Sequence, residues 1–365
     1  MKIHEKFMKK CLDLAILGLN KTKSNPLVGC VIVHNNKIIS TGYHQEFGGP
    51  HAEANALHNL KKSQPSDYKN ILKESTIYIN LEPCSHYGKT PPCLNLIIKY
   101  QIKKIVIGTI DPFKKVNGSS IQKLKKNAEV IVGVKKKECE AINQRYFINQ
   151  RLQRPFIIIK WAESKDGFIN NLSTGITRIS CEESIALTHQ WRSEIDAIMV
   201  GTNTVLSDNP QLTTRKFVGA NPVRVTIDRN NKLSDKKWNI KNQDAPTIIL
   251  HEQDSFTMKN IHYLDCRQLD TKENNSDQTK MAYIMKLLYE NGITSILIEG
   301  GTTILNNIIS QGLWDEARIF ISNKNLHKGQ QGPTINFKTK KYKTTQIGED
   351  KLFLIKNNHN TNYTE

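Results

Sequence analysis

The strongest constraint on the fold is a set of three side chains that can share one metal ion. His51 is followed two residues later by Glu53, and a second stretch runs from Pro83 to Cys93 with another cysteine at Cys84. One imidazole and two thiolates leave a fourth position open, which is typical of a catalytic zinc rather than a structural one. A water in that position loses a proton near neutral pH, and a nearby carboxylate can carry the proton onward. The chain must therefore fold so that these side chains converge.

The spacing of the ligands narrows the kind of zinc site. His-x-Glu followed by Pro-Cys resembles the signature of zinc deaminases, in which the glutamate is the general acid and base and not a ligand. Two residues separate the cysteines in the nucleobase deaminases, whereas eight separate Cys84 from Cys93 here. The alternative is a closed structural zinc site or two unrelated buried thiols. A closed site, however, needs a fourth ligand and leaves Glu53 without a role.

Composition limits the other classes of protein. A length of 365 residues predicts two or three globular domains. The formal net charge of +18 would suit nucleic acid, but the excess is mostly lysine spread along the chain, which a codon bias toward Lys, Asn and Ile explains equally well. Seven cysteines without a regular framework favour a reducing cytoplasm. The short apolar run near the N-terminus is broken by Asp13 and predicts neither a membrane span nor a cleaved leader.

Apolar periodicity predicts strands that alternate with helices in the first half of the chain. The expected helices cover 4–19, 51–60, 93–100 and 119–126, and the expected strands cover 25–33, 37–40, 76–81, 104–108 and 130–132. This alternation predicts a βαβ sheet, in which ligands bind at the carboxyl ends of strands and the N-termini of helices. The polar stretch near 146–154 predicts a domain junction, which divides the chain into residues 1–148 and 149–365.

The second half repeats the α/β pattern. Strands are expected at 156–162, 196–201, 223–228, 247–250 and 295–299, helices at 182–192, 280–291 and from Thr302, and a loop at 266–280. The Gly300-Gly301 pair before a helix could admit a phosphate at the helix N-terminus, or could only form a tight packing turn. No Gly-x-Gly-x-x-Gly fingerprint follows a strand, so any dinucleotide is expected to bind to a fold other than the Rossmann fold.

Several motifs of the first half together resemble one enzyme family, the bifunctional deaminase/reductase of riboflavin biosynthesis. They are Asn25-Pro26-x-Val28-Gly29, Gly42-x-His44, His51-x-Glu53 and Pro83-Cys84-Ser85-His86-x-Gly88-x-Thr90-Pro91-Pro92-Cys93. The resemblance implies a cytidine-deaminase-like three-layer α/β/α domain, with zinc on His51, Cys84 and Cys93 and with Glu53 as the catalytic proton shuttle. It also implies substrate contacts for Asn25, His44, His86, Lys89 and Thr90. On plainer interpretations, Asn25 shapes a turn, His44 is a packed imidazole and Lys89 is solvated.

Motifs of the second half resemble the reductase half of the same family. They are Lys160-Trp161-Ala162-x-Ser164-x-Asp166-Gly167, Trp191-Arg192-Ser193, Gly201-x-x-Thr204-Val205-x-x-Asp208-x-Pro210-x-Leu212-Thr213-x-Arg215 and Glu299-Gly300-Gly301. The resemblance implies a dihydrofolate-reductase-like α/β domain that uses NADPH to reduce the ribose to ribityl. It implies NADPH contacts for Ala162, Thr204, Asp208, Asp228, Gly300, Gly301, Thr302 and Thr303. Substrate contacts are implied for Arg192, Leu212, Arg215 and Glu299, although either arginine could instead form a surface ion pair.

One departure from the family pattern falls between the first strand and the helix of this half. Family members usually carry Ser-x-Trp-Ile-Thr, whereas this chain has Ile176-Thr177-Arg178-Ile179-Ser180. Thr177 is expected to replace the serine hydroxyl toward the substrate. Arg178 stands where the tryptophan would, and there it could either pair with a cofactor phosphate or weaken the reductase.

The resemblance implies zinc-dependent deamination of 2,5-diamino-6-ribosylamino-4(3H)-pyrimidinone 5′-phosphate, followed by NADPH-dependent reduction to 5-amino-6-(5-phospho-D-ribitylamino)uracil. One alternative is a deaminase of RNA or free nucleosides with a binding module, which predicts a two-residue cysteine gap and exposed aromatics beside basic residues. Another is a deaminase with a decayed, structural second domain. We expect phosphoribosyl-pyrimidine substrates, one zinc per chain, no nucleic acid, no membrane and a cytoplasmic location. The oligomeric state stays open, a homo-oligomer included.

Overall fold

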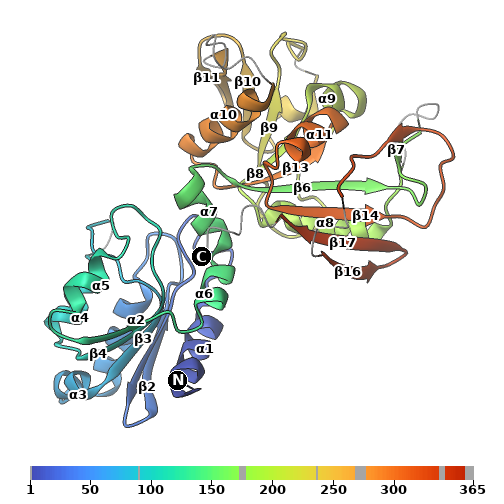
Figure 1. The fold of residues 1–365 in the computed structure, drawn as a ribbon. Helices are drawn as coiled ribbons and strands as arrows, with labels where there is room; N and C mark the ends of the chain where they lie inside the picture. Colours follow the sequence, from blue (N-terminus) through green and yellow to red (C-terminus); the bar gives the residue numbers. More distant parts are fainter. Residues whose placement is uncertain are drawn as a thin grey trace. The chain divides into compact units, whose positions relative to one another are not determined.

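The computed structural model divides the chain into two compact units, Met1–Leu152 and Gln153–Glu365 (Figure 1). The structure describes residues 2–88, 91–171, 178–235, 237–267, 277–336 and 342–357, without the side chains of 277–279. Lys89, Thr90 and Thr177, for which the sequence predicts substrate contacts, lie outside these residues. Each unit has a sheet and a hydrophobic core of its own.

A five-stranded sheet forms the centre of the first unit, in the order β2-β1-β3-β4-β5. Strand β1 pairs antiparallel with both β2 and β3, while β3, β4 and β5 are parallel. The strands are β1 (Gly29–His34), β2 (Lys37–Tyr43), β3 (Thr76–Leu81), β4 (Lys104–Thr109) and β5 (Glu129–Val132). The predicted hairpin turn is confirmed, because Asn35 and Asn36 both have positive φ, 48° and 59°, as the favoured two-residue hairpin turn requires.

Helices cover both faces of this sheet, so the predicted three-layer α/β/α arrangement is confirmed. Helices α1 (Lys2–Ile16) and α6 (Lys136–Ile142) pack on one face, against Val31, Tyr78 and Val106. The opposite face carries α2 (Ala52–Ser63), α3 (Tyr68–Glu74), α4 (Cys93–Lys99) and α5 (Ser119–Leu124). Strand residues alternate between the two faces because successive strand side chains point in opposite directions.

Gly42 sets how closely α2 lies on the sheet. A Cβ at this position would stand 2.4 Å from the backbone oxygen of Ala52 and 2.4 Å from the backbone nitrogen of Ala56. The first turns of α2 therefore rest directly on the backbone of β2. This close contact fixes the start of the helix, which is where His51 and Glu53 lie.

The second unit contains a ten-stranded sheet among its described residues, in the order β11-β12-β10-β9-β8-β13-β6-β14-β17-β16. Its strands are β6 (Phe156–Glu163), β8 (Ala197–Val200), β9 (Val223–Ile227), β10 (Thr247–His251), β11 (Phe256–Met258), β12 (Ile261–Asp265), β13 (Ser295–Gly300), β14 (Glu316–Ile321), β16 (Tyr342–Ile347) and β17 (Asp350–Lys356). The strands from β12 to β14 in that order are parallel, and β11, β16 and β17 pair antiparallel. A separate pair joins β7 (Phe168–Asn170) to β15 (Gln330–Gln331).

Two helices of this unit begin directly after neighbouring parallel strands. Helix α9 (Thr202–Asp208) follows β8, and α11 (Thr302–Ser310) follows β13. Their N-termini therefore lie at the same edge of the sheet. The other helices in the described part of this unit are α8 (Glu182–Ser193), α10 (Asp277–Glu290) and the short η1 (Asn239–Lys241). The core contains buried side chains of α10, α11 and the central strands, among them Ile284, Leu288 and Leu305.

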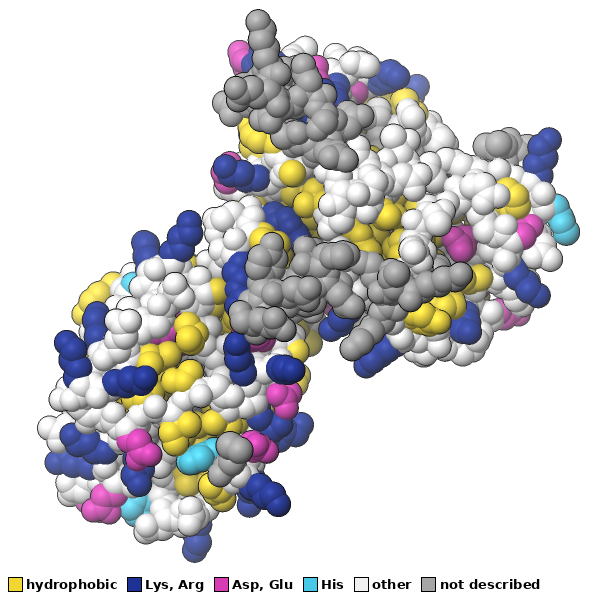
Figure 2. All heavy atoms as spheres, in the orientation of Figure 1, with side chains coloured by type: hydrophobic (Ala, Val, Ile, Leu, Met, Phe, Trp, Pro, Cys, Tyr) yellow, Lys and Arg dark blue, Asp and Glu magenta, His cyan; other side chains and the backbone are white. Residues whose placement is uncertain are grey.

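Charge and hydropathy add two observations. Figure 2 shows lysine and arginine side chains spread over the visible face of each unit rather than gathered on one element. Among the residues described, none of the helices combines the length and the apolar character needed to cross a membrane.

Candidate functional site

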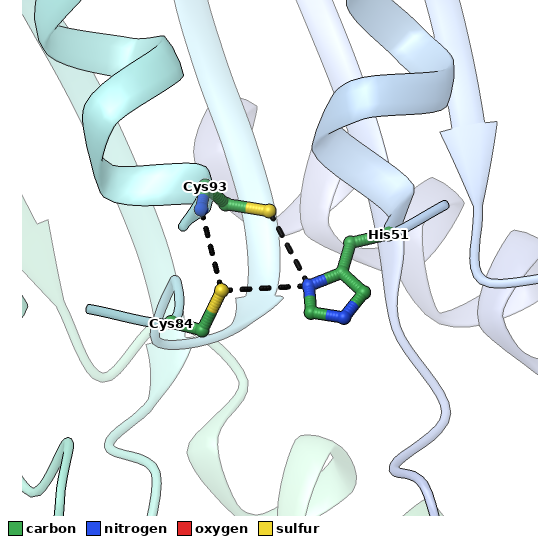
Figure 3. Close-up of side chains that lie close together, drawn as sticks. All are labelled: His51, Cys84 and Cys93. Carbon is green, nitrogen blue, oxygen red and sulfur yellow. Dashed lines mark hydrogen bonds between the residues drawn. The ribbon is translucent and has the colours of Figure 1, made fainter. Parts of the chain in front are cut away.

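The three expected metal ligands converge in the first unit (Figure 3). His51 is the N-cap of α2, Cys84 follows the end of β3, and Cys93 is the first residue of α4. His51 Nδ1 lies 3.4 Å from the sulfur of Cys84 and 3.4 Å from that of Cys93. The three ligand atoms all lie within 4.8 Å of one another. One strand end and two helix starts therefore bring together side chains that are far apart in the sequence.

The chemistry of this donor set fits zinc. Two sulfurs and one imidazole nitrogen are ligands that zinc accepts in tetrahedral geometry, and three protein ligands leave one position for a water or substrate. Hydrogen bonds from the Cys93 thiol and from His51 outweigh burial and lower the pKa of Cys84 to about 4. The Cys93 thiol is the donor in that pair, and this role together with burial raises its own pKa. A thiolate beside an imidazole is the arrangement that attracts a divalent metal ion.

Glu53 lies in the first turn of α2, and only 3% of it is exposed. Burial raises the pKa of this carboxyl, and the negative charge of Cys84 raises it further. A raised pKa favours uptake of a proton, which a general acid and base at neutral pH requires. The structure thus places a buried carboxyl with a raised pKa beside the three ligands.

His44 and Asn25 lie next to this cluster and are hydrogen-bonded to each other. His44 Nδ1 is 3.0 Å from the backbone oxygen of Pro50, and its Nε2 is 3.0 Å from Asn25 Nδ2. An oxygen acceptor on one side and an amide donor on the other favour the tautomer with the proton on Nδ1. The His44 and His51 rings meet edge to face, with their centroids 5.4 Å apart. His86 packs its ring against Phe113, with centroids 5.0 Å apart.

Two buried asparagines of this unit were missed by the sequence analysis. Asn80 accepts a hydrogen bond from the Gly29 N–H (2.7 Å) and donates one to the oxygen of Leu27 (3.0 Å). Asn143 accepts from the Leu27 N–H (2.7 Å) and donates to the same oxygen (2.9 Å). Together they fix the backbone that carries Asn25 toward His44. The signal in the sequence was a polar residue, Asn80, inside an otherwise apolar strand.

A second group of charged side chains lies in the other unit. Arg192, near the end of α8, forms a two-pronged ion pair with Glu299 of β13, with N–O distances of 3.0 and 2.7 Å. Its remaining nitrogen donates to the Thr213 backbone oxygen at 3.0 Å. Arg192 and Lys160 hold the pKa of Glu299 below its usual value, although burial opposes them. Burial and the charge of Arg192 lower the pKa of Arg215. Three residues with predicted substrate contacts, Arg192, Arg215 and Glu299, are therefore close enough to influence one another.

Residues with predicted NADPH contacts gather at the edge where α9 and α11 begin. Gly301 is the N-cap of α11 with φ of 79°, and the Thr204 hydroxyl of α9 lies 3.6 Å from the site of a Cβ on it. The Thr302 hydroxyl accepts a hydrogen bond from Gln330, and Thr303 follows it in α11. The sequence prediction that Gly300-Gly301 precedes a helix is confirmed.

The other predicted contacts are more dispersed. Asp228 follows β9, and its carboxylate accepts the backbone N–H groups of Lys232 and Leu233 at 2.8 and 2.9 Å. Ala162 lies in β6, Leu212 is buried with φ of 56°, and Asp208 ends α9. Arg178 is 62% exposed and pairs with Glu182. In this structure the Arg178 guanidinium is therefore already paired with a carboxylate of the chain itself.

Comparison with known proteins agrees with this two-part organisation. Residues 1–109 match the family model of the cytidine and deoxycytidylate deaminase zinc-binding region, and residues 155–352 match the RibD C-terminal domain. These matches define the class: a zinc-binding deaminase fold joined to a reductase domain. The chain is 32% identical to riboflavin biosynthesis protein RibD of Aquifex aeolicus, over 97% of this chain and 99% of that protein. It is 34% identical to RibD of Actinobacillus pleuropneumoniae, over 90% and 85% of the two chains. The chain belongs to the RibD family of riboflavin biosynthesis proteins.

Solved structures give the same result. A diaminohydroxyphosphoribosylaminopyrimidine deaminase/5-amino-6-(5-phosphoribosylamino)uracil reductase from Thermotoga maritima is 32% identical, with a TM-score of 0.80 over 97% of this chain and 99% of that one. RibD of Acinetobacter baumannii is 26% identical, with a TM-score of 0.79 over the same shares of the two chains.

Proposed function

We propose that this chain is a bifunctional enzyme of riboflavin biosynthesis, which deaminates 2,5-diamino-6-ribosylamino-4(3H)-pyrimidinone 5′-phosphate and then reduces its ribose to ribityl. The observation that carries the proposal is the convergence of His51, Cys84 and Cys93 beside the buried Glu53. Membership of the RibD family supports the pairing of the two activities in one chain. The substrates are therefore small phosphoribosyl-pyrimidines, and the proposal requires neither nucleic acid nor a membrane.

In the deaminase half, His51, Cys84 and Cys93 would hold the zinc, which when bound lowers the pKa of a water in the fourth position. Glu53 accepts a proton from the attacking water and later returns it to the departing ammonia. Its raised pKa favours the uptake of this proton. Asn25 and His44 orient the pyrimidine, because their mutual hydrogen bond holds both side chains at the edge of the ligand cluster. His86, Lys89 and Thr90 stand in the sequence between the two cysteine ligands, and we assign them contacts with the substrate.

In the reductase half, NADPH supplies the hydride, and the chain supplies binding and orientation. Gly300, Gly301, Thr302 and Thr303 would receive the cofactor at the start of α11, where backbone N–H groups suit a phosphate. Thr204, Asp208, Ala162 and Asp228 complete the proposed cofactor contacts, and Arg178 would join them only after releasing Glu182. The proposed substrate contacts of this half are Arg192, Leu212, Arg215 and Glu299. Thr177 would join them, with its hydroxyl in place of that of a serine. We place the enzyme in the cytoplasm, because all seven cysteines are free thiols.

The test follows both half-reactions with the purified full chain. Ammonia release from the diaminopyrimidine substrate should depend on zinc, and NADPH oxidation should require the deaminated product. Ammonia release without NADPH oxidation would mean that the second unit is a structural domain. Release of ammonia from cytidine or from adenosine in RNA, but not from the phosphoribosyl-pyrimidine, would support a nucleic-acid deaminase and overturn the proposal.

A further inference from the structure

Glu82 is a buried carboxylate that the proposed mechanism does not use. It stands between the end of β3 and the ligand Cys84, and only 3% of it is exposed. Oε1 accepts the backbone N–H groups of Ser120 and Ile121 at 3.0 and 3.3 Å. Oε2 accepts those of Gly118 and Asp111 at 2.8 and 3.3 Å. One side chain thus satisfies four backbone donors.

The four donors all belong to one stretch, residues 111–121, which we call the β4–α5 loop; it ends in the first residues of α5. The backbone of Glu82 is attached just before this loop as well, since its N–H donates to the oxygen of Thr109, the last residue of β4, at 2.9 Å. The attachment therefore begins at the end of β4 and extends through the start of α5. A carboxylate with only acceptors is the one common side chain that can pair with so many N–H groups.

Three more contacts join this loop to residues on the other side of Cys84. The hydroxyls of Ser85 and Ser119 lie 3.0 Å apart, and Ser85 also donates to the Lys115 oxygen at 3.3 Å. The ring of His86 packs on Phe113. Residues 82, 85 and 86 are thus attached to the β4–α5 loop, while the sulfur of Cys84 accepts the Cys93 N–H at 3.3 Å.

We propose that Glu82 is a positioning residue that holds the backbone of Cys84, and hence its sulfur, in the geometry that zinc and the substrate require. Side chains behind metal ligands commonly contribute about 10- to 100-fold to metal affinity. Glu82 acts on the metal only through the backbone of Cys84, because its oxygens are occupied by N–H groups of the loop. The inference rests on the zinc site proposed above.

The decisive variant is Glu82→Gln in the full chain. Glutamine has the same size, but an NH₂ group replaces one of the two carboxylate oxygens and cannot accept a hydrogen bond. The two backbone N–H groups that this oxygen now binds would lose their acceptor and face another donor. We expect zinc to pass to a chelator about tenfold faster or more. We also expect kcat for deamination to fall while KM changes little, since Glu82 does not touch the substrate. Glu82→Asp keeps the acceptors on a shorter side chain and should recover part of both losses.

Glu140→Gln is the matched control. Glu140 is also buried, and it accepts a hydrogen bond from the Thr109 hydroxyl at 3.1 Å, but it lies on α6, remote in sequence from the ligand loop. It should lose stability without faster zinc release. If Glu82→Gln and Glu140→Gln released zinc to the chelator at the same rate, Glu82 would contribute only to stability, and the proposal would be overturned.

A milder variant covers the case in which Glu82→Gln does not fold. Ser119→Ala removes only the Ser85–Ser119 contact, and it should speed zinc release in the same direction by a smaller factor. Release at the wild-type rate would then overturn the proposal. A full chain that binds no zinc at all would instead contradict the proposed function, so the two failures are distinguishable.

Discussion

A substitution of Glu53 tests the proposed deaminase mechanism at a single side chain. Glutamine has nearly the same shape but cannot take up a proton, so Glu53→Gln should retain zinc on His51, Cys84 and Cys93 and lose deamination. General acid–base catalysis contributes about 10²- to 10⁴-fold, which is the expected fall in kcat. Elemental analysis and ammonia release measure the two quantities.

The exposed Glu74 at the end of α3 provides the matched control, and Glu74→Gln should leave both quantities unchanged. Deamination by Glu53→Gln at the wild-type rate would show that another group carries the proton. Loss of zinc together with activity would instead make Glu53 a part of metal binding.

The lowered pKa of the buried His189 makes the stability of the second unit depend on pH. It is 2% exposed on α8, and burial together with the charges of Arg192 and Arg215 lowers its pKa to about 4. In the unfolded chain its pKa returns to about 6.5, so between these values the unfolded state binds the extra proton. Stability is therefore complete above about pH 6.5 and falls as the pH drops toward 4.

All four tryptophans, Trp161, Trp191, Trp238 and Trp314, belong to the second unit, so their fluorescence follows its unfolding. Denaturant titrations at several pH values should show that His189→Gln flattens the decline between pH 6.5 and 4. The same change at the exposed His262 should leave the slope intact. An unaltered slope in His189→Gln would assign the acid sensitivity to other groups.

At the scale of elements, a buried ion pair joins the starts of β6 and β14. Arg154 forms two hydrogen bonds with Asp315, at 2.6 and 2.8 Å, and Asp315 also accepts the Ile157 N–H at 2.8 Å. The side chains are 7% and 0% exposed. Asp315→Asn should lower the free energy of unfolding by about 3–5 kcal/mol, because the charge of Arg154 then stays buried without its counterion.

The double variant Arg154→Met/Asp315→Leu should recover part of this loss, since it removes both charges. It also takes the acceptor from the Ile157 N–H and the Arg154 donor from the Pro155 oxygen, so the recovery is incomplete. Glu290→Gln, which breaks the exposed Lys286–Glu290 pair on α10, should have a far smaller effect. Tryptophan fluorescence during denaturant unfolding measures all three variants. Equal losses in the single and double variants would show that the lost backbone hydrogen bonds, and not the buried charge, determine the cost.

The sequence predicts those elements whose burial leaves a regular pattern. Strand β3 was predicted at its observed bounds, 76–81, because four of its six residues are apolar. Helix α7 (Gln144–Leu152) lies mostly within the stretch 146–154, for which the sequence predicts a polar junction, and α6 lies just before it. Each is short, and α7 buries only Phe147, Ile148 and Asn149, too few for a clear helical period. The exposed β16 was missed for the same reason, since five of its six residues face solvent.

The candidate site likewise contains residues that the sequence predicts and contacts that it does not. The ligands His51, Cys84 and Cys93 were predictable because metal binding demands particular atoms at particular spacings. The hydrogen bonds of Glu82 and Asn143 were not, because their partners are backbone groups that any residue carries. The pairing of Arg178 with Glu182 likewise depends on a side-chain conformation that no motif encodes.

At the scale of the whole molecule, the two units differ in what stabilises them. The first unit has cores on both faces of its sheet and contains every residue of the proposed zinc site. The second unit has its own core around β6, β13 and α10. Zinc that binds only the folded first unit stabilises that unit by mass action, by about 2.7 kcal/mol when free zinc is about 100 times its dissociation constant.

Removal of zinc by a chelator should therefore weaken the first unit and change the second much less. Hydrogen exchange should accelerate in peptides that cover 76–99, which contain β3, Cys84 and α4, and readdition of zinc should restore protection. The tryptophan unfolding transition should shift far less, because all four tryptophans lie after residue 152. The variant Cys93→Ser, which lacks one ligand, should resemble the chelated protein with or without added zinc. If chelation moves the tryptophan transition as far as it alters exchange in 76–99, the two units unfold as one, and the metal stabilises the entire chain.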